Sequence, residues 1–178
     1  MPPRWVKPFE DETDLLLFPP LRSAWGLRGQ RLEVPISGFN ARRVVFGTIN
    51  IDTGHRLFLA RPRPRGEDFR AFLQIIRRHY RGWHVALLLD EDPSHTAGGS
   101  QDLAVEMGIE LIWLPKRCPE LNGMDHLWGH GKDHVSANRQ YSEIDQEVER
   151  FIHYLKGLSN RDALCQAGIL SEEFWLRV

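Results

Sequence analysis

Two apolar runs that each lead to an aspartate constrain the fold of this chain most strongly. Residues 85–89 end directly on Asp90, and residues 109–114 lead through a Pro-rich loop to Asp125. Both runs are expected to be strands buried on both faces of a sheet, and the first shows no polar alternation. Carboxylates from neighbouring strand ends can converge, and they then need protons or cations to neutralise them. A hard cation with oxygen ligands is the simplest occupant.

Further strands are expected before these runs, in an antiparallel meander. They are predicted at residues 4–10, 31–36, 42–51 and 56–60. The last two form a hairpin. Pro8 shortens or breaks the first strand, because proline donates no hydrogen bond to a neighbouring strand. Alternation along this strand puts Phe9 and Asp11 on one face. Glu10 and Glu12 then belong to the other face.

Helices are expected at residues 66–80, 100–107, 122–135 and 142–158. Ser100, Asn122 and Ser142 are the expected N-caps of the last three. Strands that meander and then alternate with helices make an α/β fold, in which a mixed sheet is covered by helices on both faces. A chain of 178 residues fits one domain over residues 1–158, with residues 159–178 as a C-terminal helical tail of the same domain.

The composition is that of a globular protein with no general attraction to DNA. Hydrophobic residues make up 42% of the chain, charged residues make up 26%, and the formal net charge is −1. DNA-binding modules are usually basic, so any DNA contact is expected to be local or supplied by another polypeptide. No apolar run has the length of a membrane span, and the acidic start is unlike a signal peptide. Two cysteines without metal-type spacing fit a reducing compartment. We therefore expect a cytoplasmic protein without membrane contact.

The loop and helix after the second apolar run carry the most specific motif. Its residues, with the strand end before it, are Asp90, His95, Trp113, Pro115, Pro119, Glu120, Asn122, Asp125, Trp128 and Lys132. Over residues 5–155 the chain resembles the DDE/D transposases, specifically the mariner-related transposases of bacterial insertion sequences. The third acid is Asp, as in the mariner branch. Glu91 and Gly123 stand where these relatives typically carry Asn and Pro.

The resemblance implies a ribonuclease H-like fold with a mixed five-stranded sheet. It implies metal-dependent cleavage of DNA strands and strand transfer, with two Mg²⁺ or Mn²⁺ ions held by three catalytic acids. By this resemblance Asp90 bridges both ions, Asp11 shares one and Asp125 holds the other. The implied partners are double-stranded DNA, a second copy of the chain in a homodimer, and a helix-turn-helix DNA-binding part. That part is expected to be a separate polypeptide or a missing N-terminal region.

Each acid, and the function itself, also has a plainer interpretation. Asp11 could lie in a solvated acidic turn, and Asp125 could serve helix capping, because Asn122 begins that helix. The chain could be a catalytically silent transposase remnant that only contacts protein or DNA. A stand-alone ribonuclease H-like nuclease would share the acids, but the motif does not favour it.

Basic residues and histidines are the remaining candidates. The candidate DNA contacts are Arg61, Arg63, Arg65, Lys116, Arg117 and Lys132. The three arginines on a stretch stiffened by prolines suit phosphates, although a solvated loop is an equal alternative. His95 is expected to orient the loop near the acids rather than to bind metal. His126, His130 and His134 would line one face of a continuous helix, where zinc is a minor alternative.

Overall fold

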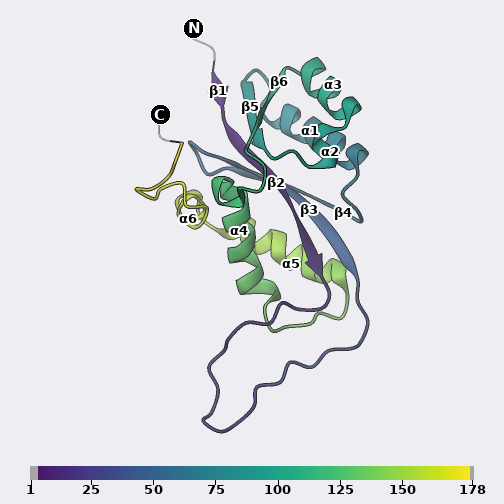
Figure 1. The fold of residues 1–178 in the computed structure, drawn as a ribbon, viewed down its shortest axis with the longest axis vertical. Coiled ribbons are helices and arrows are strands. Elements are labelled where there is room, and N and C mark those ends of the chain that lie inside the picture. The colour runs from purple at the N-terminus through teal and green to yellow at the C-terminus, as the bar shows by residue number, and fades with distance from the viewer. Residues whose placement is uncertain (1–3, 177–178) are drawn as a thin grey trace.

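The structure, a computed structural model, describes residues 4–176 and contains one mixed sheet with helices on both faces (Figure 1). The strands are β1 (Trp5–Val6), β2 (Pro8–Leu16), β3 (Arg42–Asn50), β4 (Arg56–Arg61), β5 (His84–Leu89) and β6 (Ile109–Trp113). The helices are α1 (Gly66–His79), α2 (Pro93–Thr96), α3 (Gly98–Glu106), α4 (Gly123–Gly131), α5 (Ile144–Gly157) and α6 (Asn160–Gln166). Two shorter elements are the 3₁₀-helix η1 (Pro119–Leu121) and the π-helix η2 (Lys132–Ser136). Among the described residues, no helix has both the length and the apolar character of a membrane span.

The sheet has six strands, against the five of the fold that the resemblance implies, and the predicted strand over residues 4–10 is divided into β1 and β2. β1 pairs with β5 through Trp5 and His84, and β2 pairs with β5 through Phe9 and Leu88, both in parallel. The two short pairings lie end to end along one side of β5. β6 runs parallel to β5 on its other side, while β2, β3 and β4 form the antiparallel meander. The expected break near Pro8 is confirmed, but the proline opens β2 rather than ending β1.

Three predictions about strands are wrong. β2 does not end at residue 10 but continues through the acidic residues to Leu16, because buried Leu15 keeps the alternation going. Residues 31–36 form no strand and lie in a loop. β6 is not buried on both faces, and its last two residues are exposed. In the described chain β6 pairs only with β5, so it is an edge strand.

The sheet separates two cores, which confirms the predicted helices on both faces (Figure 1). On one face α4, α5 and α6 cover Phe9 of β2, and their cluster includes Trp128, Phe151 and Leu164. On the other face α1 and α3 cover the sheet. That second cluster includes Phe46, Phe69, Phe72, Leu73 and Ala104. α6 therefore packs into the same core as β2.

Helix positions agree with the predictions, but two predicted caps are wrong. Ser100 lies inside α3, and its hydroxyl donates to the Ser94 carbonyl at 2.9 Å. Ser142 lies before α5, where Glu143 is the N-cap residue and its side chain makes no capping bond. The Ser142 hydroxyl donates to Gln146 at 3.2 Å. Both serines use the local side-chain bonding that competes with capping.

Residues 17–41 form a long loop that extends away from the sheet (Figure 1). The base of the loop is closed where Leu17 N donates to Ala41 O at 2.9 Å. Trp25 is fully exposed, and Phe39 is 78% exposed. Apolar side chains gathered on one exposed segment are typical of a surface that contacts another molecule.

Gly47 in β3 lets α4 pack closely against the sheet. A Cβ atom at this position would overlap the ring of Trp128 and the methyl group of Met124. Trp128 has little room to move, because the rings of Phe58 and Phe151 each lie with centroids 5.8 Å from its own. We expect Gly47→Ala to lower the free energy of unfolding by about 1–3 kcal/mol, as overpacking does. Urea denaturation measures this change.

Gly129→Ala is the matched control for this prediction. Gly129 lies in α4, and a Cβ atom there would meet no other atom within 4 Å. Alanine favours a helix over glycine by roughly 1 kcal/mol, so this variant should be at least as stable as the parent. Equal losses in the two variants would contradict the steric explanation.

Candidate active site

The three aspartates that the sequence predicts as site acids line one cavity. Its volume is about 380 Å³, and it lies where β5 and β6 end. The lining residues are Asp11, Glu12, Asp90, Leu114, Pro115, Arg117, Cys118, Pro119, Asn122 and Asp125. The cavity is therefore bounded by β2, by the residue after β5, and by the Pro-rich loop with the start of α4.

The strand register brings Asp11 and Asp90 to the same level of the sheet. Phe9 pairs with Leu88 across the parallel strands β2 and β5. Asp11 and Asp90 each come two residues further along their strands, so this pairing carries both to the same end of the sheet. Asp11 shares the face of Phe9, which is the face that α4 covers.

Asn122 fastens the start of α4 to β2. Its Oδ1 accepts from Met124 N at 3.0 Å, which confirms the predicted helix cap. Its Nδ2 donates to the carbonyl oxygen of Glu10 at 2.8 Å, and the side chain is buried. Asp125 lies in the first turn of α4. These two hydrogen bonds therefore hold Asp125 at the end of the sheet where Asp11 lies.

Asn122→Ala is expected to destabilise the protein by about 2–3 kcal/mol. It removes a helix cap, worth roughly 1 kcal/mol, and leaves the Glu10 carbonyl without its donor, which costs roughly 1–2 kcal/mol more. Asn122→Ser keeps a capping oxygen and adds no charge, so its stability should fall between that of the parent and that of the alanine variant. Urea denaturation measures both. Equal losses for serine and alanine would mean that the cap contributes nothing.

Burial, together with repulsion among the acids, raises the pKa of Asp11. Burial raises this pKa to about 8, and the carboxylates of Glu12, Asp90 and Asp125 add to the increase. Asp11 is therefore mostly protonated at neutral pH unless a cation is bound. The pKa of Asp90 is lowered instead, chiefly by its hydrogen bond from His95. A cavity with clustered oxygen donors and excess negative charge fits hard divalent cations.

A second group of ionisable residues lies beside these acids, and sequence reasoning missed it. His95 is fully buried, and its Nδ1 lies 3.1 Å from both the carbonyl oxygen and Oδ1 of Asp90. Its Nε2 lies 3.2 Å from Glu10 Oε2 and 3.1 Å from Glu12 Oε2. Burial by itself lowers the pKa of His95, but the three carboxylates outweigh burial and raise the pKa to about 12. Burial raises the pKa of Glu10. The alternation that puts Glu10 and Glu12 on one face of β2 was the available signal.

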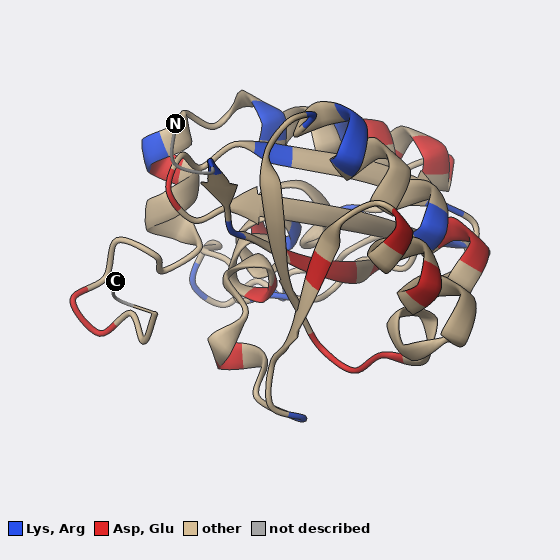
Figure 2. Ribbon diagram, turned by 90° about the horizontal axis from the view of Figure 1, so that it is seen from above, with Lys and Arg blue, Asp and Glu red and all other residues tan. Residues whose placement is uncertain are grey.

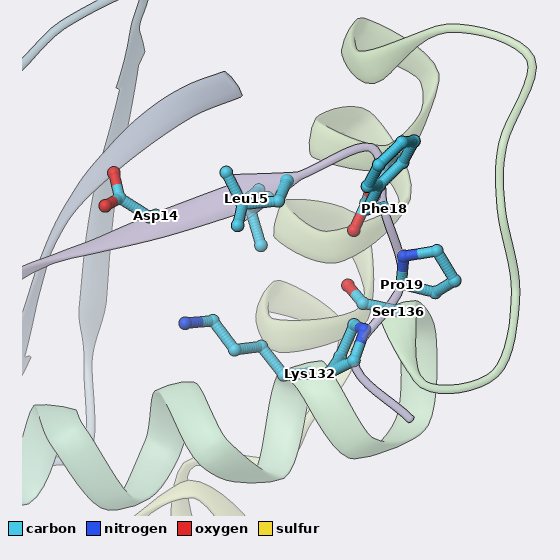
Figure 3. A pocket seen from close by; sticks show the side chains of 9 residues that line it. Asp14, Leu15, Phe18, Pro19, Lys132 and Ser136 are labelled. Carbon is cyan, nitrogen blue, oxygen red and sulfur yellow. The ribbon is translucent and has the colours of Figure 1, made fainter. Parts of the chain in front are cut away.

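Three of the predicted DNA contacts lie near the acids or close to α4. Arg117 lines the acid cavity, and the neighbouring Lys116 pairs with Glu91 at 2.9 Å. Lys132, at the start of η2, points into a second cavity of about 300 Å³ that Asp14 also lines (Figure 3). Burial lowers the pKa of Lys132. Only Arg117 of these three side chains lines the acid cavity.

The other three candidates lie at the end of β4 and in the turn before α1, and none of them lines the acid cavity. Arg61 pairs with Asp68 at 3.0 Å, Arg65 pairs with Glu67 at 3.1 Å, and Arg63 is exposed. Figure 2 shows Lys and Arg interspersed with Asp and Glu over the ribbon, in keeping with the net charge of −1. Of the six basic residues, therefore, only Arg117 lines the acid cavity.

The zinc alternative for His126, His130 and His134 finds no support. The described residues contain one group of three His, Cys, Asp or Glu side chains with converging ligand atoms, and these histidines are not in it. The rings of His130 and His134 lie with centroids 4.2 Å apart, and His130 Nε2 is 2.9 Å from the hydroxyl oxygen of Tyr154. The helix also changes from α4 to η2 at Lys132, which breaks the predicted continuous face.

Carboxylates gathered at the strand ends of a mixed sheet with helices on both faces suit an enzyme that uses divalent metal ions. The family model of the DDE superfamily endonucleases matches residues 8–147. This range contains Asp11, Asp90 and Asp125. The chain belongs to the DDE superfamily of endonucleases, and the predicted family is confirmed.

Similar proteins and structures agree with this family. The "Insertion element IS630 uncharacterized 39 kDa protein" of Shigella sonnei is 26% identical over 153 residues, which cover 85% of this chain and 45% of that protein. The chain thus spans less than half the length of this relative. The Mos1 transposase paired-end complex with left transposon end has a TM-score of 0.72 at 16% identity, over 94% of this chain and 53% of that chain. A Mos1 transposase catalytic domain with raltegravir and Mn has a TM-score of 0.64 at 15% identity, over 94% and 78%. The predicted ribonuclease H-like fold is confirmed.

Proposed function

We propose that this chain is the catalytic part of a transposase, which cuts DNA strands at transposon ends and joins them to a target. The observation that carries this proposal is that Asp11, Asp90 and Asp125 line one cavity in a chain of the DDE superfamily. The Mos1 complex with a transposon end supports double-stranded DNA as the substrate.

The three aspartates would hold two divalent ions, Mg²⁺ or Mn²⁺. Asp90 would contact both ions, Asp11 one and Asp125 the other, as in the family that the motif resembles. In the described chain their oxygen atoms do not all lie within 4.8 Å of one another. The proposal of two ions rests on the family that the motif resembles and on the chemistry of phosphoryl transfer, in which two neighbouring ions can stabilise the attacking and the leaving oxygen. Bound ions of this kind supply Lewis-acid stabilisation of phosphoryl oxygens and an activated water.

The basic residues would position the DNA backbone. Arg117 lines the cavity beside the acids, and a guanidinium there can bind a phosphate next to the reacting one. Lys116 is exposed and is paired with Glu91, an ion pair that a phosphate can replace. Lys132 and the arginines at positions 61, 63 and 65 would contact DNA further from the cleaved bond.

Two partners complete the proposed assembly. The exposed apolar side chains of the loop over residues 17–41 support contact with a second copy of the chain in a homodimer. A net charge of −1 supports a distinct helix-turn-helix part that reads the transposon ends. Analytical ultracentrifugation of the parent and of a Trp25→Ser variant tests the homodimer on end DNA, and equal dimerisation would exclude a role for Trp25.

A catalytically silent remnant that only binds protein or DNA is the second candidate. It is favoured by the ion pairs that engage Arg61, Arg65 and Lys116, together with the low net charge. The three acids favour the enzyme, because a remnant has no need of a strained carboxylate cluster.

A cleavage assay separates the two functions. The purified chain is incubated with labelled DNA carrying the ends of its own element, with a helix-turn-helix part supplied and with Mg²⁺ or Mn²⁺ present. Strand nicks at the ends that disappear with a chelator are the expected result. Binding of this DNA without any nicks in either metal would support the silent remnant.

A further inference from the structure

We propose that Glu10, Glu12 and His95 form a second metal site, which takes a transition ion such as Zn²⁺, Mn²⁺ or Co²⁺. The three side chains each offer one ligand atom, and these atoms all lie within 4.8 Å of one another. Glu10 and Glu12 project from the face of β2 opposite to Asp11. The site therefore has ligands of its own and goes beyond the proposed function, although it borders the acid cavity at Glu12 and contacts Asp90 through His95.

Buried atoms that make no hydrogen bond point to a ligand at this place. Glu10 and His95 are 0% exposed. Both carboxylate oxygens of Glu10, Oε2 of Glu12 and Nε2 of His95 make no hydrogen bond within the described chain, although Nε2 forms ion pairs with Oε2 of each glutamate. One ring N–H cannot satisfy three carboxylate oxygens, and a buried carboxylate without partners is costly. A cation among these four atoms would satisfy them together.

The spacing of the ligand atoms matches that around a small cation. His95 Nε2 lies 3.2 Å from Glu10 Oε2 and 3.1 Å from Glu12 Oε2. An ion that binds nitrogen and oxygen at about 2.0–2.2 Å places neighbouring ligand atoms roughly 3.0–3.5 Å apart. Both distances fall within that range.

The other ring nitrogen of His95 orients the imidazole for metal binding. Its Nδ1 lies 3.1 Å from the carbonyl oxygen of Asp90, which can only accept a hydrogen bond, so Nδ1 carries a proton. An ion that displaces the proton from Nε2 would then find the Nε2 lone pair on the side of Glu10 and Glu12. Histidine ligands usually donate their other N–H to a carboxylate or carbonyl, because this fixes the ring and raises its basicity. The ring of Phe69, with its centroid 4.5 Å away, forms an apolar wall.

Ligand chemistry and access define the class of ion. One imidazole with two carboxylates suits Zn²⁺, Mn²⁺ and Co²⁺, whereas Mg²⁺ prefers oxygen ligands and water. Glu12 lines the acid cavity and its side chain is 16% exposed, so an ion can enter from there. Since Nδ1 of His95 also contacts Oδ1 of Asp90 at 3.1 Å, an ion in this site would hold the Asp90 carboxylate in place.

The experiment measures metal binding directly. The chain is stripped with a chelator and titrated with Zn²⁺ by calorimetry in excess Mg²⁺, which occupies the aspartate site. We expect Glu10→Gln to weaken Zn²⁺ binding at least about a hundredfold, because even the partners of metal ligands change affinity 10–100-fold. With Co²⁺, proton NMR should show a paramagnetically shifted ring N–H of His95 in the parent that His95→Asn lacks. Glu12→Gln provides a second variant if thermal melting shows that Glu10→Gln does not fold.

Two control variants should bind Zn²⁺ as the parent does. Glu147→Gln neutralises another buried glutamate, 1% exposed and without a hydrogen bond in the described chain, in the other core. Asp125→Asn alters only the aspartate site. Any ion held by half-buried His130 and exposed His134 would bind to all variants alike.

A parent that binds no ion here, with Nε2 of His95 protonated in saturating Zn²⁺, would overturn the proposal. Parent-like Zn²⁺ binding by Glu10→Gln would overturn it as well. DNA cleavage is not measured, so either result leaves the proposed function untouched.

Discussion

Asp90→Asn is expected to abolish DNA strand cleavage while leaving the fold intact. In the parent, Asp90 Oδ1 accepts a hydrogen bond from Asp92 N at 3.0 Å. The asparagine side chain has the same size and keeps an oxygen that can accept this bond. It loses the charge that would hold both ions. Losing about 4 kcal/mol of transition-state stabilisation corresponds to roughly a thousandfold in rate. Nicking of labelled end DNA in Mn²⁺ measures the loss, and circular dichroism confirms the fold.

Asp92→Asn is the matched control, two residues away with the same chemical change. Asp92 caps α2 by accepting from Ser94 N at 2.7 Å, and asparagine caps a helix equally well. Its side chain does not line the acid cavity, so cleavage should stay at the parent rate. Parent-like cleavage by Asp90→Asn would remove Asp90 from the site. Inactivity of both variants would place the cause in the loop rather than in the charge of Asp90.

Asp11→Asn is expected to raise the melting temperature of the metal-free protein at pH 8 and to reduce its stabilisation by Mn²⁺. The pKa of Asp11 is about 8 in the folded protein, against 3.8 for an ordinary aspartate. Between these values the folded state binds more protons than the unfolded state, so stability from this group is lost as pH rises from about 4 to about 8. Allowing for the partial exposure of Asp11, we expect a gain of about 2 kcal/mol, or about 4–8 °C.

The difference between variant and parent across pH is the quantity to measure. The pKa of His95 is raised to about 12, so its contribution to the free energy of unfolding is also lost as pH rises above 6.5. This loss occurs in both proteins. The difference should therefore be small near pH 4 and should grow up to pH 8. Asp14→Asn is the control on the same strand, because Asp14 is exposed and pairs with Arg42 at 2.7 Å. A difference that stays constant with pH would rule out the charge of Asp11 as its cause.

Much of the fold and the acid cavity could be predicted because the signals are local. An apolar run that ends on Asp90 predicts a strand end, and Asn122 before a helix predicts a cap. The helix over residues 66–80 and the hairpin follow from the periodicity of their apolar residues. The family motif supplied Asp11, which no local pattern distinguishes from a solvated acidic turn.

The features that the sequence did not predict depend on contacts between distant segments. Glu10 and Glu12 face His95 only because the fold brings this residue of α2 against them, and nothing in the strand itself identifies that neighbour. The apolar sequence of β6 predicts a buried strand, but the exposure of its side chains depends on whether another strand or helix covers that edge of the sheet. Ser100 and Ser142 have the chemistry of caps, yet each hydroxyl finds a different partner.

The closed base of the loop over residues 17–41 has a consequence for the rate of folding. β2 and β3 pair up to Leu16 and Arg42, so the hairpin must bring together strands that are separated by the whole loop. Loop closure costs about 0.6 kcal/mol for each doubling of length, so a turn about a quarter as long would save about 1.2 kcal/mol. The native pairing would also become more local, which speeds folding. The long loop therefore makes the central hairpin slower to form than the sheet itself requires.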